Sequence, residues 1–203
     1  MKKIILLLPL IICILLSCSD NTTNPSDAKE IWPLKVGNYW VLKSTSYDKL
    51  GNVESEYTDT IIVFKDSLWN SKKIFALKSL NENIFFKYDF AYYQNGSMYG
   101  INFKTDRVDT FLIIKYPGKV GEVIIGINDT LTITSVNETY KTIAGDFICY
   151  KYSGDRNYGY LAELFDMYFS PGIGMVGNEL FTKRVGSEFY LEHKVELISY
   201  YVQ

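Results

Sequence analysis

From Ile31 onward the chain is a series of short runs in which hydrophobic and polar residues alternate, separated by clusters of Gly, Asn, Asp and Ser. A period of two is typical of β-strands that bury one face, and no stretch of ten residues carries the apolar stripe of a helix. The pattern therefore predicts an all-β domain, with strands at residues 38–47, 53–65, 73–80, 84–94, 97–104, 107–115, 123–128, 130–136, 139–152, 164–169, 176–184 and 188–202.

Turn-forming residues separate these runs. The strongest hairpin signal is Asn95-Gly96, which lies between two aromatic-rich runs. Both residues tolerate the positive φ that a tight hairpin requires. Weaker signals of the same kind lie at 50–52, 81–83, 117–118 and 185–187. Connections this short join antiparallel neighbours, so the sheet is expected to be mainly antiparallel.

The last predicted strand runs from Glu188 to Val202, and its alternation places five residues on one face: Phe189, Leu191, His193, Val195 and Leu197. Fifteen extended residues reach roughly 50 Å, more than twice the common strand length. Such a strand has to bend within a curved sheet. We therefore expect a single strongly twisted sheet of about ten strands, shaped like a half-barrel. At most one short helix is expected, with residues 160–166 as its best candidate.

The first seventeen residues follow a different pattern. Lys2 and Lys3 precede an unbroken apolar run at residues 4–16. Thirteen helical residues reach roughly 20 Å, which is short of a hydrocarbon core of about 30 Å, so a secretory signal is favoured over a spanning helix. Residues 19–29 are polar and aperiodic, as in a flexible tether. The expected parts of the chain are a signal peptide at 1–17, a modified Cys with its tether at 18–30 and one β domain at 31–203.

The sequence Leu15-Leu16-Ser17-Cys18 resembles the lipobox of bacterial lipoproteins. This resemblance implies cleavage between Ser17 and Cys18, a diacylglycerol on the Cys18 sulfur and usually a further acyl chain on the new amino group. Two or more chains anchor a protein stably in a membrane. Ser19 is not the Asp that resembles an inner-membrane retention signal, so the outer membrane is favoured, and the side that the domain faces stays open. The alternative is an ordinary secretory signal that happens to contain two Cys.

Removing the signal changes both the net charge of the chain and the number of cysteines available for a disulfide. The loss of Lys2 and Lys3 takes the formal net charge from −2 to −4. An acidic chain argues against nucleic acid as a partner and gains no attraction to an anionic membrane. With Cys13 removed and Cys18 acylated, Cys149 has no intramolecular disulfide partner. It lies in a strand-like apolar run and is interpreted as a small buried hydrophobe rather than a nucleophile.

Three segments, at 31–40, 144–150 and 168–176, resemble a group of uncharacterised bacterial lipoproteins. They carry an aromatic-Pro-Leu-x-x-Gly-Asn-x-Trp opening, an Ala-Gly followed by an apolar strand, and a Pro-Gly-x-Gly-x-Val segment. Asp146 departs from the Thr that is commoner in that group. The resemblance implies the coiled antiparallel sheet of lipoprotein carriers and related β-rich envelope lipoproteins, and it implies no known activity. Trp32 and Trp40 of the opening are expected to pack over one end of the sheet.

A search for catalytic and cofactor motifs finds little. His193 is the single imidazole, and without a G-x-S-x-G elbow it is interpreted as a core histidine rather than a general base. One His and one free Cys do not assemble a common metal site, and no calcium-loop motif is present. The G-x-G-x-x-G at 172–177 lacks a flanking βαβ unit. We therefore expect no cofactor, no metal and no catalysis, with a hydrolase using His193 as the less favoured alternative.

The aromatic residues are the remaining clue to function. The chain contains 17 Tyr, 12 Phe and 3 Trp, all after the signal. Strand propensity and core filling account for such rings in general. The alternative is a concave face that holds an apolar ligand or a carbohydrate, with Tyr158 and Tyr160 of the polar loop 153–160 as candidate contacts. The favoured hypothesis is a lipid-anchored, non-catalytic binding or scaffolding module for an apolar ligand, glycan or envelope protein. A periplasmic carrier of lipid and a purely structural component are the other possibilities.

Overall fold

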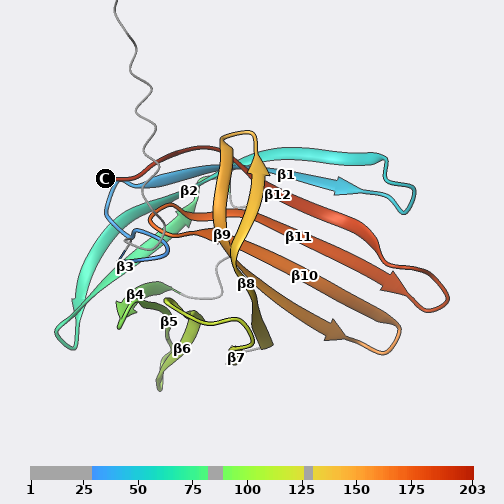
Figure 1. Cartoon of the computed structure of the whole chain (residues 1–203). Helices are drawn as coiled ribbons and strands as arrows, with labels where there is room; N and C mark the ends of the chain where they lie inside the picture. Colours follow the sequence, from blue (N-terminus) through green and yellow to red (C-terminus); the bar gives the residue numbers. More distant parts are fainter. Residues whose placement is uncertain (1–28, 82–88, 126–129) are drawn as a thin grey trace, which may run out of the picture.

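The computed structural model describes residues 29–81, 89–125 and 130–203, and within these ranges all regular structure is β-strand (Figure 1). The expectations for the signal, the lipobox and most of the tether lie outside the described residues. The strands are β1 (Tyr39–Tyr47), β2 (Val53–Trp69), β3 (Lys72–Ser79), β4 (Phe90–Gln94), β5 (Ser97–Phe103), β6 (Val108–Ile114), β7 (Val123–Ile125), β8 (Thr130–Thr142), β9 (Gly145–Asn157), β10 (Leu161–Ser170), β11 (Gly174–Arg184) and β12 (Tyr190–Tyr201). No helix long and apolar enough to cross a membrane occurs in this part of the chain.

All twelve strands belong to one antiparallel sheet, in the order β6-β5-β4-β3-β2-β1-β12-β11-β10-β9-β8-β7. The first and last strands pair at its middle, and the chain meanders outward from them on both sides. The sheet curls until its two edge strands, β6 and β7, approach each other. The result is a nearly closed barrel. This confirms the prediction of a single curved antiparallel sheet, with twelve strands in place of about ten.

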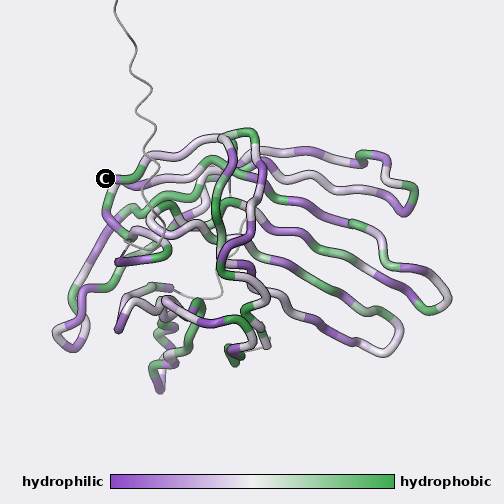
Figure 2. Tube along the Cα trace, in the orientation of Figure 1, coloured by the Kyte–Doolittle hydropathy of each residue, from purple (hydrophilic) through white to green (hydrophobic). Residues whose placement is uncertain are grey.

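The inner face of the sheet carries the core. Trp40 and Leu42 on β1 and Ile61 and Val63 on β2 are all fully buried, and the residues between them point outward. Figure 2 shows this alternation along the strands. Each such side chain contributes about 1.5–3 kcal/mol through burial. The core cluster on this face also includes Met98, Ile133, Tyr152, Phe169 and Leu197, all of them buried.

The segment before β1 closes one end of the barrel. The Trp32 and Trp40 rings meet edge to face, with their centroids 5.4 Å apart. The backbone N–H of Trp32 donates to the Tyr93 hydroxyl on β4, and that hydroxyl donates to the Trp32 carbonyl. The amide of Gly172, in the β10–β11 turn, donates to the Glu30 carbonyl. The prediction that both Trp side chains pack over one end of the sheet is therefore confirmed.

The β8–β9 hairpin bends across the outer face of the sheet (Figure 1). Its pairing shifts register at Ser135 and again before Glu138, which marks bulges in β8. We call residues 138–147, beyond these bulges, the arm. The arm reaches β12, where the amide of Ala144 donates to the Leu197 carbonyl over 3.1 Å. The strand break predicted near residues 137–138 is therefore wrong: these residues belong to the bulged strand, and the turn lies at 143–144.

The predicted helix at residues 160–166 is also absent from the structure. Leu161 to Ser170 form β10, which pairs along its length with β9 and β11. Leu164 and Phe165 point to opposite faces of the sheet, and Phe165 is buried while Leu164 is exposed. Pairing with β9 on one side and β11 on the other gives the backbone of this segment partners along the strand, and that outweighs a weak local preference for helix.

The last strand bends as its length predicts. Its pairing shifts register opposite Leu180 on β11 and opposite Val41 on β1. The first shift separates two residues that the alternation had placed on one face. Leu191 pairs with Phe181, whereas His193 pairs with Leu180, and successive residues of β11 point to opposite faces. The expectation that Leu191 and His193 share a face is therefore wrong.

Candidate functional site

His193 lies on the inner face of β12 and is half-buried. Its Nε2 is 2.8 Å from the Ser44 hydroxyl and its Nδ1 is 3.2 Å from the Ser46 hydroxyl, both on β1. Burial lowers the pKa of His193, and the nearby Glu192 raises it by a smaller amount. A catalytic triad needs an accessible hydroxyl on one ring nitrogen and a carboxylate on the other. Here Ser44 is only 3% exposed and Ser46 occupies the second nitrogen, so the arrangement joins two strands.

Three hairpin tips form one end of the sheet, which we call the rim: residues 48–52, 158–160 and 185–189. The predicted loop at 153–160 is shorter than expected, because residues 153–157 complete β9. Tyr158 and Tyr160 lie at the middle tip and are 52% and 73% exposed. The amide of Val185 lies 3.4 Å from the Tyr160 carbonyl, which joins two of the tips. Both Tyr rings are therefore available to a ligand.

A groove of about 740 Å³ lies between the β1–β2 and β11–β12 tips. Tyr47 and Glu54 belong to one wall, and Phe189, Tyr190 and Glu192 belong to the other. The two walls come from opposite ends of the domain sequence and meet because β1 pairs with β12. Sequence reasoning had not proposed these residues as a site.

Local hydrogen bonds hold both walls of this groove. One oxygen of Asp48 accepts the amides of Leu50 and Asn52, and the other accepts the Asn52 side chain. The bonds from Asn52 and the turn amides lower the pKa of Asp48. In the opposite wall, the Ser187 hydroxyl accepts the amide of Arg184 and donates to its carbonyl. Walls fixed in this way lose little entropy when a ligand binds.

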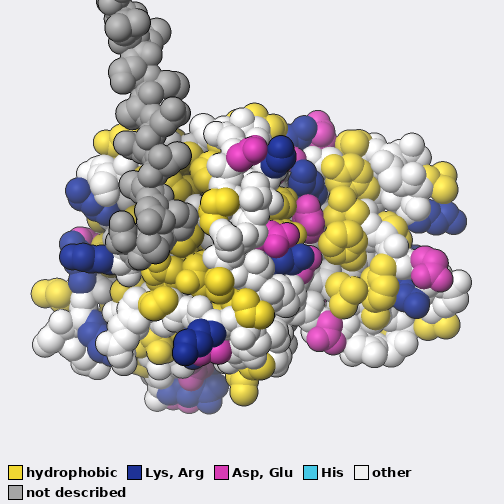
Figure 3. Space-filling model, viewed as in Figure 1, with side chains coloured by type: hydrophobic (Ala, Val, Ile, Leu, Met, Phe, Trp, Pro, Cys, Tyr) yellow, Lys and Arg dark blue, Asp and Glu magenta, His cyan; other side chains and the backbone are white. Residues whose placement is uncertain are grey.

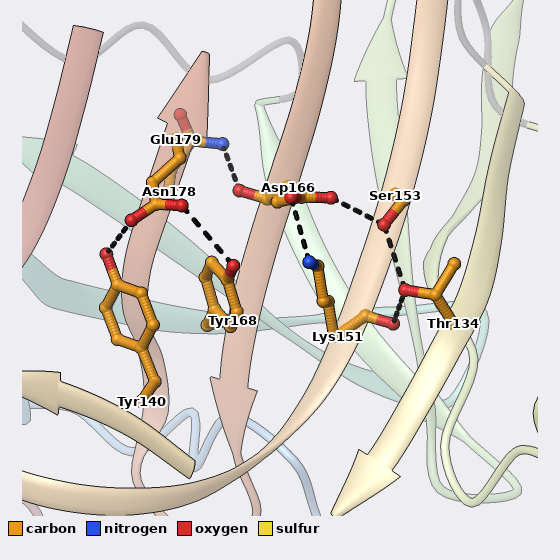
Figure 4. Close-up of polar contacts among 8 residues, drawn as sticks. All are labelled: Thr134, Tyr140, Lys151, Ser153, Asp166, Tyr168, Asn178 and Glu179. Atoms are coloured by element: carbon orange, nitrogen blue, oxygen red, sulfur yellow. Dashed lines mark hydrogen bonds and ion pairs between the residues drawn. The ribbon is translucent and has the colours of Figure 1, made fainter. Parts of the chain in front are cut away.

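A second polar cluster lies on the outer face, where the arm crosses the sheet (Figure 4). The Tyr140 and Tyr168 rings stack with centroids 3.9 Å apart, and both hydroxyls donate to Glu179, over 3.3 and 3.4 Å. Burial, followed by the charge of Glu179, raises the pKa of Tyr168 to about 12. Both phenols therefore stay protonated at neutral pH and serve as donors that hold the arm on β10 and β11.

The same cluster continues onto β9 and β8. Lys151 forms an ion pair with Asp166 over 2.9 Å, and the Ser153 hydroxyl donates to Asp166. The Thr134 hydroxyl is 2.9 Å from that of Ser153, so the bonds cross three strands (Figure 4). Each carboxylate in the cluster is already engaged by donors of this chain. The arrangement therefore stabilises the outer face of the sheet.

Cys149 lies on β9 and is fully buried, as the sequence predicted. Burial raises its pKa to about 12, so the side chain is a thiol and not a thiolate at neutral pH. Within the described ranges, no group of three or more His, Cys, Asp or Glu side chains is arranged to hold a metal ion.

An apolar row crosses the outer face near the rim. Leu164, Phe181 and Leu191 are cross-strand neighbours on β10, β11 and β12. Figure 3 shows hydrophobic side chains exposed over this part of the sheet, next to a band of charged ones. On the same part of the sheet β12 carries the ion pair Lys194–Glu196, and Lys43 on β1, which is paired with Glu196, forms an ion pair with Glu56 on β2. Rings, aliphatic side chains and charges thus lie close together at this end of the molecule.

No family model matches the chain, and no curated protein does. Among solved structures, a candidate lipoprotein from Parabacteroides distasonis matches with a TM-score of 0.50 and 18% sequence identity, over 86% of this chain and 100% of that one. A candidate exported protein with a YmcC-like fold from Bacteroides fragilis matches with a TM-score of 0.47 and 13% identity, over 84% of this chain and 98% of that one. At these identities the likeness is one of fold.

Proposed function

We propose that the protein is a lipid-anchored protein of the bacterial cell envelope that acts as a non-catalytic binding module. Cys18 would carry the lipid, after cleavage between Ser17 and Cys18, and Ser19 favours the outer membrane. The proposal is supported by the resemblance of residues 15–18 to a lipobox and by the fold shared with the candidate lipoprotein from Parabacteroides distasonis. Its binding surface is the rim, where Tyr158 and Tyr160 are exposed.

The observation that carries this proposal is the position of the rim relative to the tether. The tether ends at Glu30, which is bonded to the β10–β11 turn. From that turn β10 runs nine residue steps to Leu161 at the rim, a length of about 30 Å. The tether itself, residues 18–30, spans at most about 45 Å when fully extended. The rim therefore lies at the end of β10 opposite to the one where the tether joins the domain, so attachment through the tether leaves the rim uncovered for a partner.

Ring contacts in the core support a surface binder over a carrier of lipid. A carrier needs an internal cavity large enough for acyl chains. Here Trp32 contacts Phe169, and Phe169 contacts Tyr152, with ring centroids 5.7 and 5.8 Å apart. The groove at the rim lies outside this cluster. The hydrogen bonds between His193 and the hydroxyls of Ser44 and Ser46 also favour a binding module over a hydrolase, because they engage both ring nitrogens.

Metabolic labelling with radioactive palmitate tests the anchor. We expect Cys18→Ala to abolish incorporation of the label and to release the protein from the membrane fraction. Cys13→Ala, in the same apolar segment, is the matched control and should keep both. Labelling of the Cys18→Ala protein, or loss of labelling in the Cys13→Ala protein, would contradict the proposal.

A further inference from the structure

The groove at the rim carries aromatic rings on both walls. Tyr47 lies at the end of β1, and Phe189 and Tyr190 face it from the β11–β12 side. Phe189 is 39% exposed, and the two Tyr side chains are half-buried. Rings held by strand ends present flat apolar faces at a small cost in conformational entropy. Such faces suit the C–H face of a sugar ring as well as an apolar side chain.

The same groove carries both signs of charge. Its charged side chains are Asp48, Lys49, Glu54, Arg184, Glu188 and Glu192. The Asp48 carboxylate is used by its own turn, and Glu192 accepts a hydrogen bond from Thr182. Glu54, Glu188 and Arg184 form no ion pair with any residue that the structure describes. Acceptors and donors are therefore both available to a ligand.

This mixture discriminates among classes of ligand. An apolar ligand would remove water from charged groups without replacing their hydrogen bonds, which is unfavourable. A polyanion would meet four carboxylates, whereas a polycation would find those carboxylates interleaved with Lys49 and Arg184, so a ligand of a single sign always faces like charges in the groove. The hydroxyl groups of a neutral polyol donate hydrogen bonds to carboxylates and accept them from Arg and Lys, and its C–H faces stack on aromatic rings. The groove volume of about 740 Å³ is within the usual range for small-molecule sites.

We propose that this groove binds a neutral glycan, with pyranose rings stacked on Phe189 and Tyr190 and hydroxyls bonded to Glu54, Glu188 and Arg184. The inference deepens the proposed function by naming the ligand class of the binding module, and it rests on that function. Tyr160 lies outside the groove, at the neighbouring tip, where its carbonyl faces the amide of Val185 and its side chain is exposed. A further exposed ring on the same rim fits a chain of sugars rather than a single one.

The test uses the full mature protein, reconstituted in nanodiscs when palmitate labelling shows the lipid and kept in buffer when it does not. The probes are tetrasaccharides of glucose, N-acetylglucosamine, mannose and galactose, together with heparin as a polyanion and octalysine as a polycation. Saturation-transfer NMR and calorimetry report binding. We expect at least one neutral tetrasaccharide to bind, with the strongest saturation on its ring C–H protons, and to bind more tightly than heparin or octalysine.

Variants locate the binding in the groove. We expect Phe189→Ala to weaken the affinity about tenfold and Glu188→Gln to weaken it about fivefold. The matched controls are Phe64→Ala, at an exposed ring, and Glu138→Gln, at a half-buried carboxylate; both lie outside the groove and should keep the affinity within about twofold. Equal unfolding midpoints for all four variants show that folding is not the cause.

Three results would overturn the inference: no binding of any neutral tetrasaccharide, tighter binding of heparin or octalysine, or an unchanged affinity in Phe189→Ala. Palmitate labelling at Cys18 is independent of all three. A labelled protein that binds no glycan therefore overturns the ligand class alone, and an unlabelled one that binds glycan overturns the anchor alone.

Discussion

Tyr140 lies directly against Gly177: a Cβ added at Gly177 would be 2.2 Å from Cε1 of the Tyr140 ring. Gly177 is on β11 and Tyr140 is on the arm that crosses it. The arm therefore reaches the sheet at a position of β11 where no side chain separates them. Its approach also brings the Tyr140 hydroxyl to Glu179, two residues along the same strand.

We expect Gly177→Ala to lower the free energy of unfolding by about 1–3 kcal/mol, because the added methyl group overpacks the contact. Urea denaturation measures this loss. In a Tyr140→Ala background the space is empty, so the same substitution should cost much less, and the two changes should be strongly non-additive. An equal cost in both backgrounds would show that the Tyr140 ring is not the obstacle.

Tyr168 gives the protein a dependence on alkaline pH. Its pKa in the fold, about 12, lies above the ordinary value of 10. Its contribution to stability is therefore fully present below pH 10 and is lost as the pH rises toward 12, because the unfolded chain releases the proton first. We expect Tyr168→Phe to reduce the loss of stability over this interval in urea titrations. Tyr201→Phe, at an exposed ring, is the control, and an identical pH slope in both variants would contradict the assignment.

Much of the sheet could be predicted because its signals are local. The Asn95-Gly96 hairpin is present, with φ of 53° and 79° at its two residues, as the dipeptide predicts. The bulge at residues 135–138 was misread because Asn137 is as typical of a turn as of an irregular strand. The choice between a turn and an irregular strand depends on how the arm packs over Tyr168 and Gly177. That contact joins residues that are distant in sequence.

The candidate site was harder to predict than the fold. Exposure of Tyr158 and Tyr160 follows from a local turn, and both were identified. The groove beside them depends on pairing between β1 and β12, which no local pattern encodes. The surroundings of His193 were equally hard to predict, because the bulge at Glu192 changes which residues of β12 lie on the same face of the sheet as His193. Strand periodicity is thus informative until a single extra residue reverses it.

His193 makes the protein sensitive to acid. Burial lowers its pKa below the ordinary value of 6.5, while Glu192 opposes this and the facing β1 residues, Ser44 and Ser46, are uncharged. The unfolded chain therefore takes up the proton first, and the contribution to stability is present above pH 6.5 and lost as the pH falls below it. We expect His193→Gln to flatten the pH dependence of the urea midpoint in this interval. A steeper dependence in the variant would contradict this account.

Asn38 joins the segment before β1 to the end of the chain. It is fully buried; its side-chain amide donates to the Pro33 carbonyl over 2.8 Å, and its side-chain oxygen accepts the amide of Gln203 over 3.1 Å. Asn38→Ala leaves both backbone groups without these partners, so we expect the free energy of unfolding to fall by about 1–3 kcal/mol. Asn137→Ala, at an exposed bulge, should change it by less than about 0.5 kcal/mol. Hydrogen exchange should also accelerate at Gln203 in the first variant only, and equal exchange in the two variants would exclude Asn38 as the connection between these ends.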